Sequence, residues 1–322
     1  MVGLDYTVAL KGRVINMKLF FAFLISFFLL LVVACKYTKK EKKIETDSPQ
    51  KGSINISVDE SFKPVIEEQI KVYESTFTDV KINAFYKSEV ECFKDLQNDS
   101  TRMIIVARGL NKNERKYYES SLKFMPYYTN VAYDAVAVIV NQKGKDSVFT
   151  MARLYNILSG KEKVVAVMDG KNATSTVRYL QDSILKGKPF GSNVVASKNS
   201  EDVVNIVAST ENAIGFVGLS WVGNRYDAKQ INQLKIIKLA LVECTICKDG
   251  EFAKPSQATI TYLQYPLARP LYYIVKENTT GLGTGFGNFM GMERGQLIFR
   301  RAFLAPAKIS FNKRSSNIKT DD

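Results

Sequence analysis

The chain has 322 residues, a formal net charge of +13 at pH 7 and 46% hydrophobic residues. It contains no histidine, which excludes Ser-His-Asp and Cys-His catalysis, His-ligated zinc and the commonest general base. The basic residues are scattered rather than clustered in a stripe, so a nucleic-acid-binding protein is not indicated, and neither an enzyme nor a cofactor is predicted.

Residues 1–34 have the composition of an export signal. Met17 and Lys18 begin a short basic region, and residues 19–34 form an apolar run. This run is short for a membrane span, which needs about 20 residues, and it suits a signal peptide. Residues 1–16 lack periodicity, so Met17 is a candidate for the true start of the protein.

The apolar run ends at Val32-Val33-Ala34-Cys35, which resembles the lipobox of bacterial lipoproteins. The resemblance implies that Cys35 is lipidated and becomes the mature N-terminus. A plain signal peptide and a retained anchor helix are the alternatives. Residues 35–51 are polar and rich in lysine, which predicts a tether that separates a membrane from the domain that follows.

The next part of the chain alternates between strand-like and helix-like segments. Pro64 favours the first turn of a helix, and the apolar residues after it recur at helical spacing. The patterns predict strands over 53–58, 80–86 and 103–107, and helices from Pro64, over 89–98 and over 111–122. This order predicts a largely parallel sheet covered by helices.

The same alternation restarts at Tyr133 and predicts a second α/β lobe. The expected strands are 133–140, 164–168 and 214–217, and the expected helices are 150–158, one from Ser175, and 200–209.

A hydroxyl-rich turn, Thr174-Ser175-Thr176, opens one of these helices. The first N–H groups of a helix have no intrahelical partner and carry the positive end of the helix dipole, so they can bind an oxyanion. Lys171 and Arg178 would add positive charge. The alternative is that Asn172 or Thr174 only caps an ordinary helix.

Five segments between residues 133 and 272 occur in a characteristic order: YDAVAVIVN (133–141), LYNILSGK (154–161), TST (174–176), NAIGFVG (212–218) and YPLARPLY (265–272). This series resembles the phosphate-binding component of bacterial phosphate ABC importers. The resemblance implies an α/β, two-lobed type II periplasmic-binding-protein fold, in which two crossing segments join the lobes and the ligand is enclosed between them. It places residues 52–132 and 261–310 in lobe 1 and residues 133–260 in lobe 2. The Lys/Arg-containing C-terminal residues 311–322 are expected to form a disordered tail.

The resemblance also implies ligand-binding residues. The family's phosphate loop after the first strand matches residues 59–64, where Ser61 would donate its hydroxyl and Phe62 its backbone N–H. Ser88 falls where the family has a ligand-binding serine, and Thr174-Ser175-Thr176 matches the family's Ser-Gly-Thr.

The charged ligand residues depart from the family pattern. Gly170 replaces the arginine that usually precedes Ser-Gly-Thr by four residues, so that role is vacant or passes to Arg178, Lys171 or Arg108. Arg108 resembles an arginine that many relatives have after the third strand; the alternative is a surface arginine that pairs with Glu114.

Arg102 aligns with the aspartate that accepts the proton of phosphate in the family. Since arginine cannot accept a hydrogen bond, discrimination against sulfate is either rebuilt or lost, and we expect poorer rejection of sulfate or arsenate than the family pattern gives. The candidates that could rebuild it are Asp59, Glu60, Glu89 and Asp134. The alternative is that Arg102 points to solvent.

Two functions follow from these patterns. The first is a monomeric, membrane-tethered lipoprotein on the periplasmic side of a bacterial envelope, which captures inorganic phosphate or a similar tetrahedral oxyanion for an ABC permease. The second is a two-lobed envelope interaction or sensor lipoprotein with a weak or vestigial anion site.

Two further motifs have ordinary interpretations. Besides Cys244 and Cys247 the chain has only Cys35 and Cys92, so a local disulfide or two idle thiols are expected rather than a zinc site. The glycine spacing of segment 281–287 matches neither G-x-G-x-x-G nor the P-loop motif of nucleotide-binding proteins. We therefore expect a tight turn before the C-terminal helix.

Overall fold

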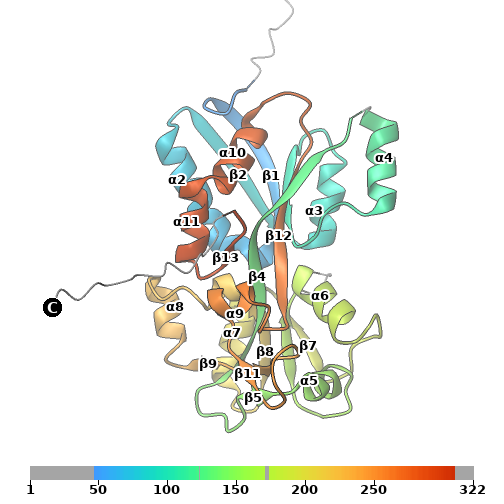
Figure 1. The fold of residues 1–322 in the computed structure, drawn as a ribbon, viewed down its shortest axis with the longest axis vertical. Helices are drawn as coiled ribbons and strands as arrows, with labels where there is room; N and C mark the ends of the chain where they lie inside the picture. The colour runs from blue at the N-terminus through green and yellow to red at the C-terminus, as the bar shows by residue number, and fades with distance from the viewer. Residues whose placement is uncertain (1–46, 123, 171–173, 309–322) are drawn as a thin grey trace, which may run out of the picture. The chain divides into compact units, whose positions relative to one another are not determined.

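The computed structural model describes residues 47–122, 124–170 and 174–308 (Figure 1). The expected signal peptide, Cys35, Lys171 and the expected tail over 311–322 lie outside the described residues. Within the described ranges, no helix is both long enough and apolar enough to cross a membrane.

The first lobe is built on a sheet in the order β2-β1-β3-β12-β4. Strands β1, β2 and β3 are parallel, whereas β12 is antiparallel to both of its neighbours. The strands are β1 (Gly52–Asp59), β2 (Val80–Lys87), β3 (Met103–Val106), β4 (Tyr127–Asn141) and β12 (Ala268–Val275). The helices are α2 (Lys63–Thr76), α3 (Glu89–Leu96), α4 (Lys112–Leu122), α10 (Leu282–Gly291) and α11 (Glu293–Arg301).

Helix α2 shows why this lobe folds as its sequence predicts. Pro64 lies in its first turn, and Val65, Ile66 and Tyr73 are at most 1% exposed against the sheet. In Figure 1, α2, α10 and α11 cover one side of the sheet, while α3 and α4 lie on the other. The core of the lobe is therefore a sheet between two helical layers.

Strand β4 runs through both lobes. Its first part pairs with β12, and residues Val136–Val140 pair with β8 of the second lobe. Residues 135–140 are at most 3% exposed, which explains their continuous apolar sequence. The strand begins at Tyr127, six residues before the predicted start at Tyr133, because the less apolar residues there pair with β12.

The second lobe continues the sheet as β4-β8-β6-β7. Its strands are β6 (Ala166–Asp169), β7 (Val194–Ser197), β8 (Ile214–Gly218) and β9 (Ile237–Leu239), and its helices are α5 (Met151–Leu158), α6 (Ser175–Ser183), α7 (Ser200–Ser209) and α8 (Ala228–Gln233). The remaining short elements are η1 (Glu60–Phe62), η2 (Leu219–Trp221), β5 (Val148–Phe149), β10 (Leu241–Glu243), β11 (Phe252–Ala253), α9 (Gln257–Thr261) and β13 (Ala305–Pro306).

The glycine-rich segment differs from its prediction. It is not a turn, because residues 282–287 lie within helix α10. Gly287 is needed for the packing of this helix, since a Cβ atom there would lie 2.7 Å from the ring of Tyr273. Tertiary packing therefore overrides the low helix propensity of glycine.

Cys244 and Cys247 form a disulfide in the loop after β10. This is one of the two outcomes expected from the sequence. Among the described residues, no group of three or more cysteines and carboxylates could hold a metal ion.

Candidate functional site

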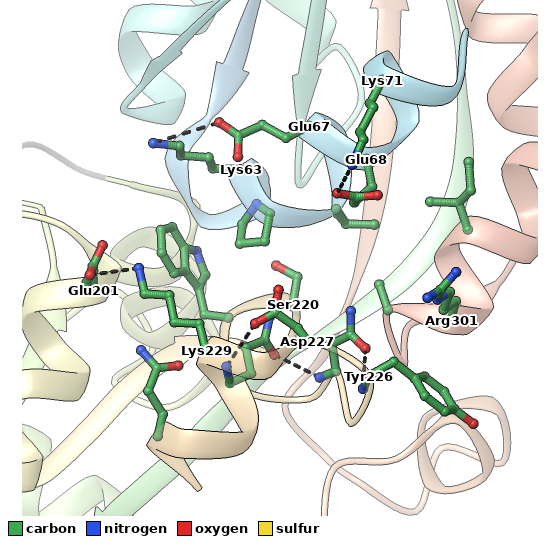
Figure 2. A pocket seen from close by; sticks show the side chains of 18 of the residues that line it. Lys63, Glu67, Glu68, Lys71, Glu201, Ser220, Tyr226, Asp227, Lys229 and Arg301 are labelled. Carbon is green, nitrogen blue, oxygen red and sulfur yellow. Dashed lines mark hydrogen bonds and ion pairs between the residues drawn. The ribbon is translucent and has the colours of Figure 1, made fainter. Parts of the chain in front are cut away.

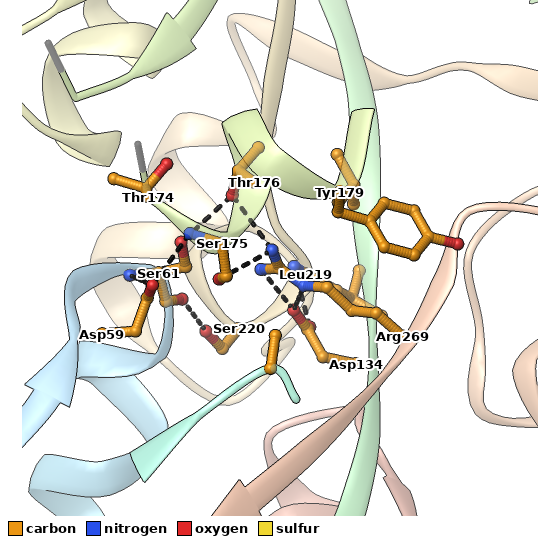
Figure 3. A network of polar contacts seen from close by, with 12 residues as sticks. Asp59, Ser61, Asp134, Thr174, Ser175, Thr176, Tyr179, Leu219, Ser220 and Arg269 are labelled. Atoms are coloured by element: carbon orange, nitrogen blue, oxygen red, sulfur yellow. Dashed lines mark hydrogen bonds and ion pairs between the residues drawn. The ribbon is translucent and has the colours of Figure 1, made fainter. Parts of the chain in front are cut away.

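A polar cluster forms where the loop after β1 meets the starts of α6 and α7 (Figure 3). The Ser61 hydroxyl lies 3.0 Å from that of Thr176 and donates to Asp169 Oδ2 at 3.2 Å. Ser220 adds a second link by donating to the Ser61 carbonyl at 3.1 Å. The two lobes therefore meet directly at the residues that sequence analysis selected for ligand binding.

Asp59 accepts hydrogen bonds from two helix starts. It is fully buried, and its carboxylate accepts the backbone N–H of Ser61 at 2.9 Å and that of Ser175 at 2.9 Å. Ser175 is the first residue of α6, so a carboxylate of the first lobe lies where an oxyanion would bind the second lobe.

Two further carboxylates complete the cluster. Asp169, fully buried at the end of β6, accepts from Thr174 Oγ1 at 2.8 Å and from Ser200 Oγ at 2.8 Å. Glu60 accepts from the backbone N–H and the hydroxyl of Ser200, at 3.3 and 2.7 Å. The start of α7 thus receives a carboxylate as well.

Arg269 brings a positive charge to the cluster. Its Nη1 atom donates to Ser175 Oγ at 3.0 Å and to Thr176 Oγ1 at 3.2 Å. Its Nε and Nη2 atoms donate to Asp134 Oδ2 at 3.0 and 2.9 Å, and both side chains are completely buried. The guanidinium also lies over the ring of Phe62, 4.9 Å from its centre.

Sequence reasoning did not select Arg269. The available signal was an arginine between Ala268 and Pro270 in an otherwise apolar strand, since a buried arginine requires a partner. Arg269 reaches the hydroxyl turn from β12.

Two other candidate cations, Arg178 and Arg108, form ion pairs. Arg178 pairs with Glu89 and Asp182. Arg108 forms two 2.8 Å contacts with Glu114. The ligand roles of both arginines stay predictions, while the ion pair of Arg108 is the alternative stated from the sequence.

Two predicted ligand residues serve as helix caps. Ser88 caps α3 in a capping box with Glu91. Thr174 caps α6 by accepting the N–H of Val177. Thr174 also contacts Asp169, so capping and membership of the cluster coexist in this residue.

The four candidate proton acceptors lie in different places. Asp59 and Glu60 belong to the cluster, whereas Asp134 accepts a hydrogen bond from Arg269. Glu89, which is 2% exposed, accepts the backbone N–H of Ala107 at 3.1 Å. Arg102 lies away from the cluster and pairs with Asp47 and Glu277.

Burial changes the acidity of the two lobe-1 carboxyls. It raises the pKa of Asp59 to about 6, with the charges of Glu89 and Asp169 adding to the effect and Arg269 opposing it. Burial raises the pKa of Glu60 to about 7; the charge of Asp169 adds, and the hydrogen bonds from Ser200 oppose. Both groups can therefore change protonation near neutral pH.

A separate cavity of about 590 Å³ lies between α2 and α11 on one side and η2 and α8 on the other (Figure 2). Charged residues of both signs line it, and they form the pairs Lys63–Glu67, Lys71–Glu68 and Lys229–Glu201. Asp59, Ser61, Thr176 and Arg269 are not among its lining residues. Ser220 lines the cavity and also donates to the Ser61 carbonyl, so the cavity adjoins the polar cluster without including its carboxylates.

The strand order, the long strand through both lobes and the helix starts that converge between them define a two-lobed α/β binding-protein fold. A family model described as "PBP superfamily domain" matches residues 43–293, and the chain belongs to this family.

The chain is similar in sequence to known proteins. It is 21% identical over 291 residues to the phosphate-binding protein PstS of Staphylococcus epidermidis, and the aligned region covers 84% of this chain and 83% of that protein. It is 23% identical over 287 residues to Protein SphX of Synechococcus elongatus, covering 82% of this chain and 81% of the relative.

A solved structure shares the fold. The putative phosphate ABC transporter substrate-binding protein of Clostridium perfringens superposes with a TM-score of 0.67 at 21% identity, over 80% of this chain and 100% of that chain. The resemblance inferred from the ordered segments and the predicted fold class are both confirmed.

Proposed function

We propose that this protein is the solute-binding component of an ABC importer and that its ligand is inorganic phosphate or a similar tetrahedral oxyanion. One observation carries the proposal: the starts of α6 and α7, the hydroxyls of Ser61 and Thr176, and the Arg269 guanidinium converge between two lobes. Backbone N–H groups, hydroxyls and a guanidinium are the donors that an oxyanion needs.

The same donors would change partners when the ligand binds. Phosphate oxygens would replace the Asp59 carboxylate at the N–H of Ser175 and would separate Ser61 from Thr176, whose hydroxyls are now 3.0 Å apart. Hinge motion of the lobes about the crossing strands β4 and β12 would admit the ligand.

We also propose that the protein acts outside the cytoplasm as a lipoprotein. The lipobox-like sequence that ends at Cys35 supports lipidation, and the polar residues 35–51 support a tether. The names of the relatives support an ABC permease as the partner that receives the ligand.

Calorimetric titration of the purified protein with phosphate tests the ligand. We expect saturable binding that Ser61→Ala weakens and that Ser120→Ala, an exposed hydroxyl change on α4, leaves unchanged. No heat of binding in the parent protein would rule out phosphate capture.

One observation favours a second function. Carboxylates of the chain itself already satisfy the donors at the starts of α6 and α7. A two-lobed envelope interaction or sensor lipoprotein with a vestigial anion site is consistent with this arrangement. A folded protein that binds neither phosphate nor sulfate would favour this alternative.

A further inference from the structure

The polar cluster contains carboxylates that, when ionised, would repel an oxyanion. Within the described residues, three carboxylates contact the donors of the cluster: Asp169 and Glu60 accept from hydroxyls, and Asp59 accepts the backbone N–H of Ser175. Among the same residues, Arg269 is the guanidinium that donates to the Thr176 hydroxyl. The charge of Arg269 is already balanced by Asp134, 2.9 Å away. An oxyanion that enters between ionised carboxylates would meet repulsion in a site that is mostly closed to water.

Hydrogen bonding leads to the same conclusion. An ionised carboxylate can only accept hydrogen bonds, and so can the unprotonated oxygens of an oxyanion. Each contact between such a pair leaves two acceptors unpaired unless a proton lies between them. Once protonated, the same carboxyl donates its O–H to the ligand oxygen.

Two groups are placed to take up these protons. Asp59 faces Glu89 of α3, Asp169 of β6, Arg269 of β12 and the start of α6. Glu60 faces Asp169, Asp59 and Ser200 at the start of α7. Like-charged neighbours and burial make the neutral form accessible near pH 7, in agreement with the raised pKa values of both groups.

We infer that Asp59 and Glu60 take up protons when the oxyanion binds, so that the site captures the anion together with protons and binds it more tightly at acid pH. This inference rests on the proposed function. Under this inference, the carboxyls of Asp59 and Glu60 determine how many protons the site takes up with the anion.

Calorimetry in buffers of different ionisation enthalpy measures the number of protons taken up per phosphate bound. At pH 8 the parent protein should take up about one proton more than Asp59→Asn and about one more than Glu60→Gln. The titration of phosphate itself contributes equally to all three proteins and cancels. Between pH 7 and 8, the affinity of the parent should fall about tenfold more than that of Asp59→Asn and about fivefold more than that of Glu60→Gln, because Glu60 is already partly protonated at pH 7.

Glu67→Gln is the matched control. Glu67 is a half-exposed carboxylate of α2, 3.8 Å from Lys63, and does not contact the cluster. This variant should take up as many protons as the parent. Asp59→Asn costs some stability because the Ser61 and Ser175 N–H groups bond different oxygens of Asp59, and the amide nitrogen of asparagine cannot accept either of them. Glu60→Gln therefore supplies the test if the first variant does not fold.

The outcomes separate the inference from the function on which it rests. Phosphate binding with equal proton uptake in the parent and both variants would overturn the inference and leave the function standing. No phosphate binding in the folded parent protein at any pH from 5 to 8 would overturn both.

Discussion

Arg269 and Thr176 are 93 residues apart in the sequence, yet Arg269 Nη1 donates to Thr176 Oγ1 at 3.2 Å inside the protein. The contact depends on strand pairing, because Arg269 lies opposite Asp134 in the β12–β4 register. Asp134 fixes the guanidinium through two hydrogen bonds, and the free Nη1 then reaches the turn of the second lobe. A crossing strand thus supplies the charge that Gly170 does not.

The first prediction concerns this ion pair. Arg269→Gln should destabilise the protein by about 3 to 5 kcal/mol, because it leaves the buried Asp134 without a counter-charge. Urea denaturation measures the loss. The double variant Arg269→Gln with Asp134→Asn should recover part of it, and equal stability of the single and double variants would contradict the assigned pairing.

The second prediction separates binding from capping at the start of α6. Thr176→Ala removes a hydroxyl that contacts Ser61 and Arg269, so phosphate affinity should fall about tenfold or more, the cost of one hydrogen bond to a charged ligand. Thr174→Ala should lower stability by about 1 kcal/mol because it removes the cap. Calorimetry and thermal melting measure the two effects.

A double variant tests whether the turn binds phosphate at all. If Thr174→Ala with Thr176→Ala binds phosphate as the parent protein does, the turn is only a helix start. Ser209→Ala, an exposed hydroxyl change on α7, controls for the loss of a hydroxyl alone.

The third prediction concerns anchoring. Cys35→Ala should move an otherwise folded protein from the membrane fraction to the soluble fraction, because a lipidated cysteine would hold it through its acyl chains. Fractionation and immunoblotting measure the distribution. An unchanged membrane fraction in the Cys35→Ala variant would show that lipidation at Cys35 is not the anchor.

The sequence predicted local structure well where periodicity and caps agree. The parallel first strands and the helix after Pro64 follow directly from burial patterns within one segment. It could not place Arg269, since only the register of β12 on β4 brings this residue to the hydroxyl turn. The helix over 282–291 was also missed, because its glycines are required by neighbours such as Tyr273 that are distant from Gly287 in the sequence.

The fourth prediction concerns stability and pH. The pKa of Asp59 rises from 3.8 to about 6 on folding, so the folded state binds more protons than the unfolded state between these values. Its contribution to stability is complete below pH 3.8 and is lost as the pH rises through about 6. A shift of this size corresponds to about 3 kcal/mol at most.

Other carboxylates act in the opposite direction at lower pH. The pKa values of Asp47 and Glu114 are lowered by their hydrogen bonds to Arg102 and Arg108, despite partial burial, so their contributions are lost on acidification. Thermal melting should therefore show greatest stability on the acid side of neutrality. Asp59→Asn should flatten the decline between about pH 4 and 6, and an identical decline in the variant would contradict the assignment.

The last prediction concerns the choice between phosphate and sulfate. The sequence alone favoured poor rejection of sulfate, because Arg102 occupies the family's acceptor position; the structure instead places Asp59 and Glu60 in the cluster. Phosphate brings at least one proton to such carboxylates, whereas sulfate brings none and requires every proton to come from solvent. Sulfate should therefore bind more weakly than phosphate at pH 7, and its affinity should fall more steeply with rising pH. Competition titrations at pH 6, 7 and 8 measure both slopes, and Glu60→Gln should narrow the difference between the anions. Parallel slopes for phosphate and sulfate in the parent protein would show that these carboxylates are not the source of discrimination between the two anions.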